Sequence, residues 1–181
     1  TLEGILFADG DRTTDTHTRI DHARPHCTSR ELYKSIVDGR GLAAALALGA
    51  DGVWVGTRFI ATPEARGVTG YKDVLLRSHE DDTIVTRAYT GKTCRVIANR
   101  YTRPYEDGER EPERFPQQIF RSMEEGANHL GGDETTPGID PEREFFPAGQ
   151  GVGAINGLVP AADLVAQFVD EAEAVLAKLR A

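Results

Sequence analysis

Apolar residues recur at helical spacing between residues 41 and 49, and this is the clearest pattern in the chain. One helix face would carry Leu42, Ala45, Leu46 and Leu48, and the alanines between them favour the helical state. Gly49 is expected to end the helix because glycine accepts the left-handed conformation at a helix terminus. The pattern therefore predicts a short helix that ends at Gly49.

A continuous apolar run follows this helix after a turn at residues 50–52. Val53, Trp54 and Val55 leave no polar face, as in the buried strands of parallel sheets. Gly56 and Thr57 would then lie at the carboxyl end of a strand, where α/β folds place their ligands. Because a glycine there lets an anion approach backbone N–H groups, the run predicts a buried strand and a ligand site at its end.

A second glycine-containing run precedes the predicted helix. Residues 38–41 read Asp-Gly-Arg-Gly, and N–H groups at the start of a helix can bind a phosphate. Gly39 is therefore a further candidate for a phosphate contact. An ordinary loop before a helix has the same pattern, so both interpretations remain open.

Further elements are expected along the rest of the chain. Thr62, followed by proline and glutamate, has the pattern of a helix start. Two β-prone runs, residues 82–90 and 94–98, are separated by a Gly-Lys pair and predict a hairpin. A helix is predicted over residues 116–130, and a long amphipathic helix over residues 160–179. The apolar face of that last helix must pack against a barrel wall or a second subunit.

The first 35 residues show no apolar period of either helix or strand. Residues 12–30 are rich in threonine, arginine and histidine, and we expect residues 1–35 to be irregular with few long-range contacts. An unrelated fused segment and a shifted reading frame of the gene both remain open as explanations.

Composition narrows the class of partner. The chain has 181 residues, 28% of them charged, and a net charge of -8, which disfavours nucleic acid as a partner. No apolar run is long enough for a membrane span. Cys27 and Cys94 are too few for a disulfide framework, so a cytoplasmic location is predicted. A homo-oligomer is compatible with this composition.

Residues 36–63 resemble the nitronate monooxygenase (2-nitropropane dioxygenase) family nearly residue for residue. The shared sequence is Ala-Leu-Ala-Leu-Gly-Ala-Asp-Gly-Val, followed closely by Gly-Thr-Arg-Phe. Residues 147–155, which include Gly-Gln-Gly, are similar to the C-terminal motif of the same family. The resemblance covers residues 36–181 and excludes residues 1–35. It implies an α/β fold, namely the C-terminal part of a flavin-binding (β/α)8 barrel with an insertion and a C-terminal helix.

The resemblance also implies a function, FMN-dependent oxidation of alkyl nitronates with O2. By this resemblance, the end of the apolar run contacts the flavin phosphate, and a glycine-rich loop lies over the flavin. The resemblance thus implies cofactor contacts at Trp54, Val55, Gly56, Thr57 and Gln150, and Gly39 joins these candidates because of its place before the predicted helix. The side-chain amide of Gln150 can both donate and accept hydrogen bonds at the ring or the substrate.

The sequence departs from the family pattern in three respects. Lys34 and Ser35 stand where the family has the Gly-Gly pair of its phosphate site. The Gly-Gly-His segment with the proposed catalytic histidine has no counterpart, so no catalytic residue is assigned. The chain is also shorter than the roughly 250 residues of a complete barrel. We therefore expect the isolated chain to bind FMN weakly or not at all.

Other functions remain open beside this one. The same motifs also resemble those of flavin-dependent enoyl reductases. They resemble those of inosine-monophosphate dehydrogenase-like barrels as well, although no catalytic cysteine loop is evident to support that alternative. A non-catalytic barrel remnant or interaction module would also keep these motifs. Residues 149–154 match Gly-x-Gly-x-x-Ala, but no buried strand precedes them, which argues against a dinucleotide fold. None of the five histidines lies in a catalytic motif, and no metal site is predicted.

Overall fold

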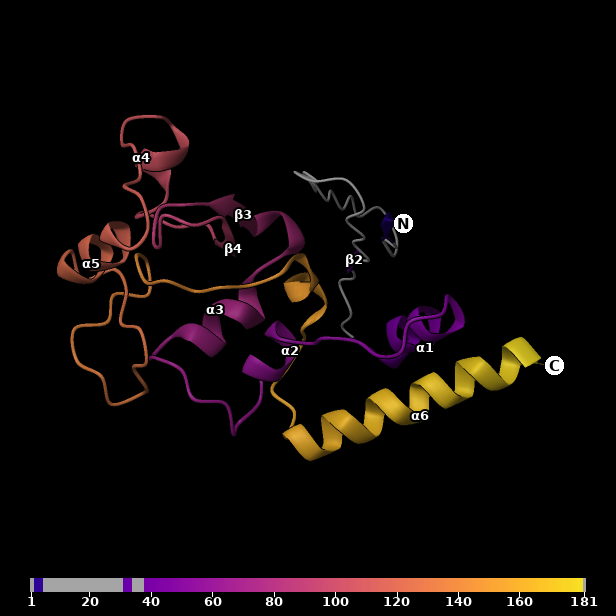
Figure 1. Cartoon of the computed structure of the whole chain (residues 1–181). Helices are drawn as coiled ribbons and strands as arrows, with labels where there is room; N and C mark the ends of the chain where they lie inside the picture. Colours follow the sequence, from indigo (N-terminus) through magenta and orange to yellow (C-terminus); the bar gives the residue numbers. More distant parts are fainter. Residues whose placement is uncertain (1, 5–30, 34–37, 181) are drawn as a thin grey trace. The chain divides into compact units, whose positions relative to one another are not determined.

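The computed structural model of the chain describes residues 2–4, 31–33 and 38–180 (Figure 1). Two compact units are present, one within residues 1–54 and 165–181, and a second over residues 55–164. We refer to them as the first and the second unit. Each contains helices and a two-stranded sheet, so the chain has the mixed α/β content expected from its sequence.

The sheet of the first unit is a short parallel pair. β1 (Leu2–Gly4) lies beside β2 (Glu31–Tyr33), with Leu2 opposite Glu31 and Gly4 opposite Tyr33. The sequence analysis expects no regular element here, so the structure differs from it at these residues. The boundary predicted between residues 35 and 36 lies outside the described residues and stays a prediction.

The first helix forms where the apolar pattern predicts it. α1 (Gly39–Ala47) begins after Asp38, whose carboxylate accepts a hydrogen bond of 2.9 Å from the N–H of Gly41. Such a cap satisfies one of the N–H groups that a helix start leaves free. Gly49 adopts a φ of 88° directly after the helix, which confirms the predicted stop.

The last helix is also confirmed, and its apolar face is only partly covered. α6 (Ala161–Arg180) begins in the second unit and continues through the first. Phe168 and Ala172 are buried, whereas Val169 and Leu179 are exposed. The backbone N–H of Gly39 donates to Glu171 Oε2 at 2.8 Å, and this hydrogen bond connects the start of α1 to α6.

The predicted strand at residues 53–55 does not form. These residues have extended or irregular backbone without a strand partner among the described residues, and Trp54 is 99% exposed. A strand requires a neighbouring backbone to satisfy its N–H and C=O groups. An apolar run alone therefore did not determine the local structure, and the prediction of a buried strand was wrong.

The second unit contains most of the regular elements. In chain order these are α2 (Thr57–Ile60), α3 (Tyr71–Arg77), η1 (Glu80–Asp82), β3 (Thr83–Thr86), β4 (Cys94–Ile97), α4 (Arg103–Glu106), α5 (Gln117–Glu124) and η2 (Gln150–Ala154). The helix start predicted at Thr62 is only a turn, in which Thr62 Oγ1 accepts from the N–H of Ala65 at 3.2 Å. Gly70, with a φ of 86°, directly precedes the next helix.

The predicted hairpin is confirmed and carries the core of the second unit. β3 and β4 pair antiparallel, with Thr83 opposite Ile97. Tyr89, in the connection between them, is completely buried. Its ring stacks on Tyr101 and packs at a tilt against Phe145, with ring centroids 4.9 and 4.7 Å away. Its hydroxyl donates to the backbone oxygen of residue 143 at 2.9 Å, so this buried phenol is paired with a partner.

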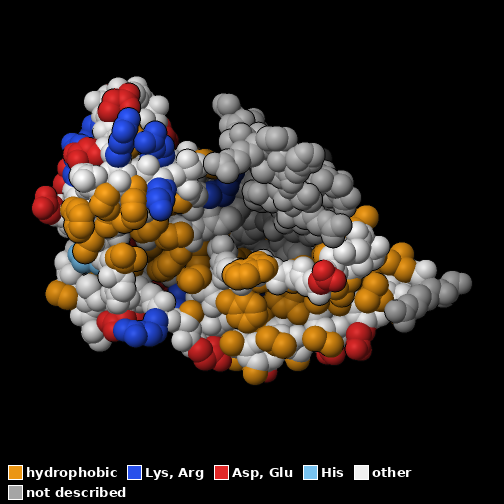
Figure 2. All heavy atoms as spheres, in the orientation of Figure 1, with side chains coloured by type: hydrophobic (Ala, Val, Ile, Leu, Met, Phe, Trp, Pro, Cys, Tyr) orange, Lys and Arg blue, Asp and Glu red, His pale blue; other side chains and the backbone are white. Residues whose placement is uncertain are grey.

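Helix α5 ends earlier than predicted and buries polar side chains. The side-chain amide of Gln118 donates to the backbone oxygen of Ala88, and Ser122 Oγ donates to that of Tyr89 at 2.9 Å. Phe120 and Met123 are instead exposed, and Figure 2 shows orange hydrophobic side chains grouped over this region. The helix therefore satisfies the backbone of the hairpin connection rather than contributing an apolar face to the core.

One extended segment links the hairpin core to the region of α2. Residues 146–148 run beside β4, where the N–H of Ile97 donates to the oxygen of Phe146 at 3.0 Å and the N–H of Ala148 to that of Arg95 at 3.2 Å. Figure 1 shows this orange segment passing the hairpin. Phe146 also stacks on Tyr71 of α3 at 4.7 Å. These contacts fix where the glycine-rich residues that follow are placed.

Candidate functional site

A hydrogen bond joins the two segments on which the sequence places a cofactor. Thr57 is the first residue of α2, and its Oγ1 accepts from the N–H of Gly149 at 3.0 Å. Gly149 directly precedes η2, the glycine-rich turn that contains Gln150. The two segments are 92 residues apart in sequence, so the fold brings Thr57 and Gln150 into one region.

Gly56 offers open space at this region. It precedes α2 directly, it is exposed, and a Cβ added to it would have no atom within 4 Å. Its φ of -98° is accessible to any residue, so the backbone does not require a glycine. The fold therefore does not explain the glycine, whereas a ligand lying against this backbone would.

Several backbone donors are available around the same turn. The N–H groups of Thr57 and Arg58 have no acceptor within the described residues, and neither do those of Gln150 and Gly151. N–H groups in successive turn residues are typical partners of phosphate oxygens. The donor set therefore fits an anionic group such as the phosphate of FMN.

The other side of the glycine-rich turn packs against η1. A Cβ added to Gly153 would lie 2.8 Å from the backbone nitrogen of Glu80 and closer still to its carboxylate. Such a contact is too short for any side chain, so Gly153 is required for packing. The close approach holds η2 between η1 and α2.

Arg58 is buried beneath this region, with 8% of its surface exposed. Its Nη1 donates to the backbone oxygens of Ala61 and Gly157, both at 3.2 Å. Burial lowers the pKa of its guanidinium, since desolvation disfavours the charged form. This arginine belongs to the Gly-Thr-Arg-Phe motif, but no role was predicted for it from the sequence.

The remaining predicted contacts are placed as follows. Val55 and Gln150 are half-buried residues of the second unit. Trp54 and Gly39 belong to the first unit, where Gly39 is buried and its N–H already donates to Glu171. A carboxylate at this position would repel a phosphate, so the surroundings of Gly39 favour a packing role. Its contact with a cofactor stays a prediction.

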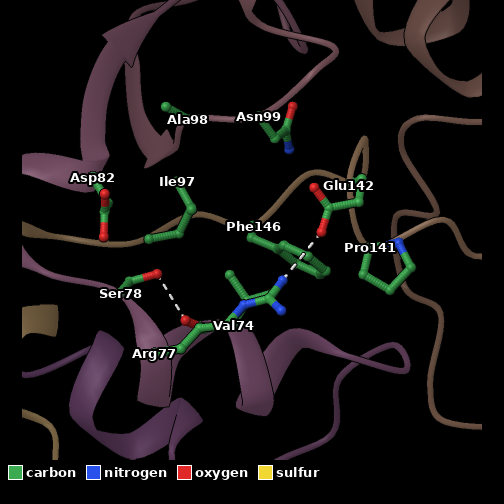
Figure 3. A pocket seen from close by; sticks show the side chains of 10 residues that line it. All are labelled: Val74, Arg77, Ser78, Asp82, Ile97, Ala98, Asn99, Pro141, Glu142 and Phe146. Atoms are coloured by element: carbon green, nitrogen blue, oxygen red, sulfur yellow. Dashed lines mark hydrogen bonds and ion pairs between the residues drawn. The ribbon is translucent and has the colours of Figure 1, made fainter.

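A separate cavity of about 220 Å³ lies on the second unit (Figure 3). Arg77 and Glu142 form an ion pair of 3.3 Å at this cavity, and Ser78 Oγ donates to the oxygen of Val74 at 2.7 Å. The lining residues are Val74, Arg77, Ser78, Asp82, Ile97, Ala98, Asn99, Pro141, Glu142 and Phe146. These differ from every cofactor contact predicted from the sequence.

A histidine held by a buried carboxylate was not predicted. Glu144 is 2% exposed, and one of its oxygens accepts from the N–H of His129 at 2.9 Å. Its other oxygen lies 2.7 Å from Nδ1 of the same histidine. The two residues are 15 positions apart in irregular structure, so no sequence period could have revealed the pair. His17, His22 and His26 lie outside the described residues.

The described residues contain neither a cluster of metal ligands nor a helix that could span a membrane. Across residues 2–4, 31–33 and 38–180, no three His, Cys, Asp or Glu side chains are grouped to hold a metal ion. Within these same residues, no helix has both the length and the apolar character needed to cross a membrane.

The sequence matches a known family profile over most of its length. The profile of the nitronate monooxygenase family matches residues 35–171. A probable nitronate monooxygenase of Staphylococcus aureus (strain JH9) is 35% identical over 103 residues, which are 56% of this chain and 29% of the relative. The corresponding protein of strain Newman is 34% identical over 101 residues. The chain thus spans less than a third of these curated relatives.

Two solved structures have a similar fold. FabK from Thermotoga maritima has a TM-score of 0.65 and 31% identity, over 83% of this chain and 46% of FabK. Nitroalkane oxidase from Streptomyces ansochromogenes has a TM-score of 0.64 and 28% identity, over 83% of this chain and 41% of the oxidase. These likenesses support the barrel fold expected from the sequence, of which this chain corresponds to a part.

Proposed function

The chain belongs to the nitronate monooxygenase family, and on that premise we propose that it forms the C-terminal part of an FMN-dependent enzyme that oxidises alkyl nitronates with O2. The observation that carries the proposal is the hydrogen bond from the N–H of Gly149 to Thr57 Oγ1. It joins the two segments in which the family motifs occur. One ligand can therefore contact both.

In this proposal the backbone around α2 and η2 binds the FMN phosphate. The N–H groups of Thr57, Arg58, Gln150 and Gly151, which have no acceptor among the described residues, would donate to phosphate oxygens, and the missing side chain at Gly56 would let these oxygens approach. Hydrogen bonds to a charged acceptor are stronger than those to a neutral one. Lys34 and Ser35, which replace the Gly-Gly pair of the family, lie outside the described residues.

Gln150 has a different role in the proposal. It lies at the start of η2, half-buried, with the turn held from one side by Thr57 and from the other by Glu80. Its side-chain amide orients the flavin ring or the substrate through one donated and one accepted hydrogen bond. FMN, when bound, supplies the electron chemistry, and the chain supplies binding and orientation.

Two alternatives follow from the same premise. A flavin-dependent enoyl reductase would use the same phosphate contacts, and the near-equal TM-scores of the two solved structures mean that the fold alone does not select an activity. A non-catalytic remnant would keep the fold without a bound flavin. We propose a cytoplasmic protein with a small-molecule substrate, and a homo-oligomer is compatible with the exposed apolar positions of α6.

A chimera tests the proposal directly. Residues 36–181 would be joined to the preceding barrel half of a curated relative, and the purified protein examined for flavin absorbance and for O2 uptake with propane-2-nitronate. The proposal predicts a yellow protein that consumes O2 and nitronate together. A yellow protein that instead oxidises a nicotinamide cofactor with an enoyl substrate would favour the reductase. A folded, colourless protein would contradict both activities.

A further inference from the structure

Arg58 makes two hydrogen bonds that connect distant parts of the second unit. Its Nη1 donates to the oxygen of Ala61, which follows α2, and to the oxygen of Gly157, which follows η2. Arg58 and Gly157 are 99 residues apart in sequence. A single guanidinium nitrogen therefore connects the end of α2 to the chain that leaves the glycine-rich turn.

A second bond connects the same two segments at their other ends. Thr57 Oγ1, at the start of α2, accepts from Gly149, which directly precedes η2. Residues 149–157 are thus attached to α2 at both ends, by Thr57 and by Arg58. A segment held at two points has fewer accessible positions than one held at a single point, because each attachment removes conformational freedom.

The burial of Arg58 shows that this attachment is more than a surface contact. The residue is more than nine-tenths buried, and no carboxylate forms an ion pair with it within the described residues. A buried cation without an acidic partner is destabilising unless its hydrogen bonds compensate. The backbone oxygens of Ala61 and Gly157 accept those bonds. The bonds therefore stabilise the buried guanidinium and, at the same time, hold the two segments together.

We propose that Arg58 is a positioning residue of the candidate cofactor site, which fixes residues 149–157 on α2 and so sets the place of the Gly149 N–H and of Gln150. Its relevance to FMN rests on the proposed function, whereas its effect on the glycine-rich turn does not. A bond from an arginine to the end of its own helix is a common stabilising feature. The bond to Gly157 goes beyond that, since it reaches a different segment.

Hydrogen exchange of the complete chain tests the attachment without any ligand. In Arg58→Met the amide of Gly149 is expected to exchange at least about tenfold faster, while the amides of Ile97 and Ala98 keep their protection. Arg58→Lys, which retains one charged donor, should restore part of the protection at Gly149. Arg66→Met is the matched control, because Arg66 is exposed and pairs only with Asp133 at the surface.

FMN titration of the same substitutions in the chimera described above, followed by flavin fluorescence, tests the link to the site. Arg58→Met should weaken FMN binding at least about tenfold, equivalent to about 1.4 kcal/mol, and Arg66→Met should leave it unchanged. Equal acceleration of exchange at Gly149 and in the hairpin would overturn the proposal, as would no acceleration at either place. Faster amide exchange confined to Gly149, together with an unchanged FMN affinity of Arg58→Met, would overturn the role of Arg58 in positioning the cofactor site.

If the wild-type chimera binds no FMN, the proposed function fails, and the exchange pattern of the chain alone decides whether Arg58 positions the turn. Acceleration confined to residues 149–157 then supports the attachment, and a uniform pattern overturns it. The two failures are therefore distinguishable.

Discussion

The hairpin core of the second unit and the α1–α6 pair of the first unit bury apolar residues to very different degrees. In the hairpin core, Tyr89 is completely buried among aromatic rings and its hydroxyl is hydrogen-bonded. In the α1–α6 pair the buried positions are mostly small, and Leu48 and Leu179 are exposed. The hairpin core encloses its central ring completely, whereas the α1–α6 pair buries mostly small residues and leaves large apolar side chains exposed.

The difference shows which contacts this chain can provide for itself. Hairpin pairing needs two strands a few residues apart, and both are present here. A buried central strand needs neighbours on both sides, and residues 53–55 have none among the described residues. The relatives are longer than this chain, and the strand predicted at residues 53–55 is the element most dependent on such neighbours.

Removal of the central ring of the hairpin core should have the largest effect. Tyr89→Ala deletes the stacking on Tyr101 and Phe145, and we expect the free energy of unfolding to fall by about 3–5 kcal/mol. Urea unfolding followed by circular dichroism measures this loss. Leu48→Ala, at the exposed position that directly follows α1, should change the free energy by less than about 0.5 kcal/mol. If both variants lost the same free energy of unfolding, the two regions would not differ in packing as described.

A methyl group at Gly39 should have the next largest effect. The added Cβ would lie 2.9 Å from the nitrogen of Ala172 and closer to Phe168 and Glu171, so Gly39→Ala should destabilise the α1–α6 pair by about 1–3 kcal/mol. Hydrogen exchange of the α1 amides measures the loss. Gly56→Ala is the control, since its Cβ meets no atom. Unchanged α1 protection in Gly39→Ala would show that the two helices do not pack as described.

A smaller effect is expected at the contact between α2 and the glycine-rich turn. Thr57→Val keeps the shape of the side chain but removes the acceptor of the Gly149 N–H, which should cost about 0.5–1.5 kcal/mol. Thermal unfolding measures the stability, and FMN titration of the chimera that carries the same substitution should show weaker binding. Thr57→Ser, which keeps the hydroxyl, should resemble the wild type. A Thr57→Val protein with full stability would mean that the bond contributes nothing to folding.

The smallest effect concerns the pH dependence of the second unit. The guanidinium of Arg110, which bonds Glu125 at 3.1 Å, lowers the pKa of that carboxyl below its usual 4.5. A lowered folded-state pKa stabilises the fold above pH 4.5, and this contribution is lost as the pH falls through the folded value.

Glu125→Gln should therefore lower the stability above pH 4.5 by up to about 1 kcal/mol and reduce its loss on acidification. Urea unfolding over a pH series measures both. Arg110→Met should flatten the acid slope less than Glu125→Gln, because Arg121 Nε still bonds Glu125 at 3.3 Å. An unchanged acid slope in both variants would exclude this pair as its source.

Much of the regular structure could be predicted from local patterns. The hairpin and α6 form where the periodicity of apolar residues places them, and Gly49 ends α1 as expected. These features depend on residues close together in sequence. The short strands β1 and β2 were not predicted, because a three-residue strand contains too few positions for a period.

The candidate site could be predicted only in part. Gly56, Thr57 and Gln150 were identified through the family motifs, and the structure places Thr57 beside the turn that contains Gln150. The bond from Arg58 to Gly157 spans 99 residues and has no local pattern, so no sequence period could reveal it. The polar interior face of α5 was missed for the same reason, because Gln118 and Ser122 are satisfied by backbone far away in sequence.

FMN affinity of a Gly56→Val variant tests the central claim most directly. Because a Cβ at Gly56 would have no atom within 4 Å among the described residues beyond its chain neighbours, the substitution should leave the fold intact, and any loss of binding then reports on the ligand. In the chimera described above, we predict that Gly56→Val weakens FMN binding at least about tenfold, about 1.4 kcal/mol, at an unchanged melting temperature. Normal FMN binding by a folded Gly56→Val chimera would contradict the assignment of the phosphate to this turn.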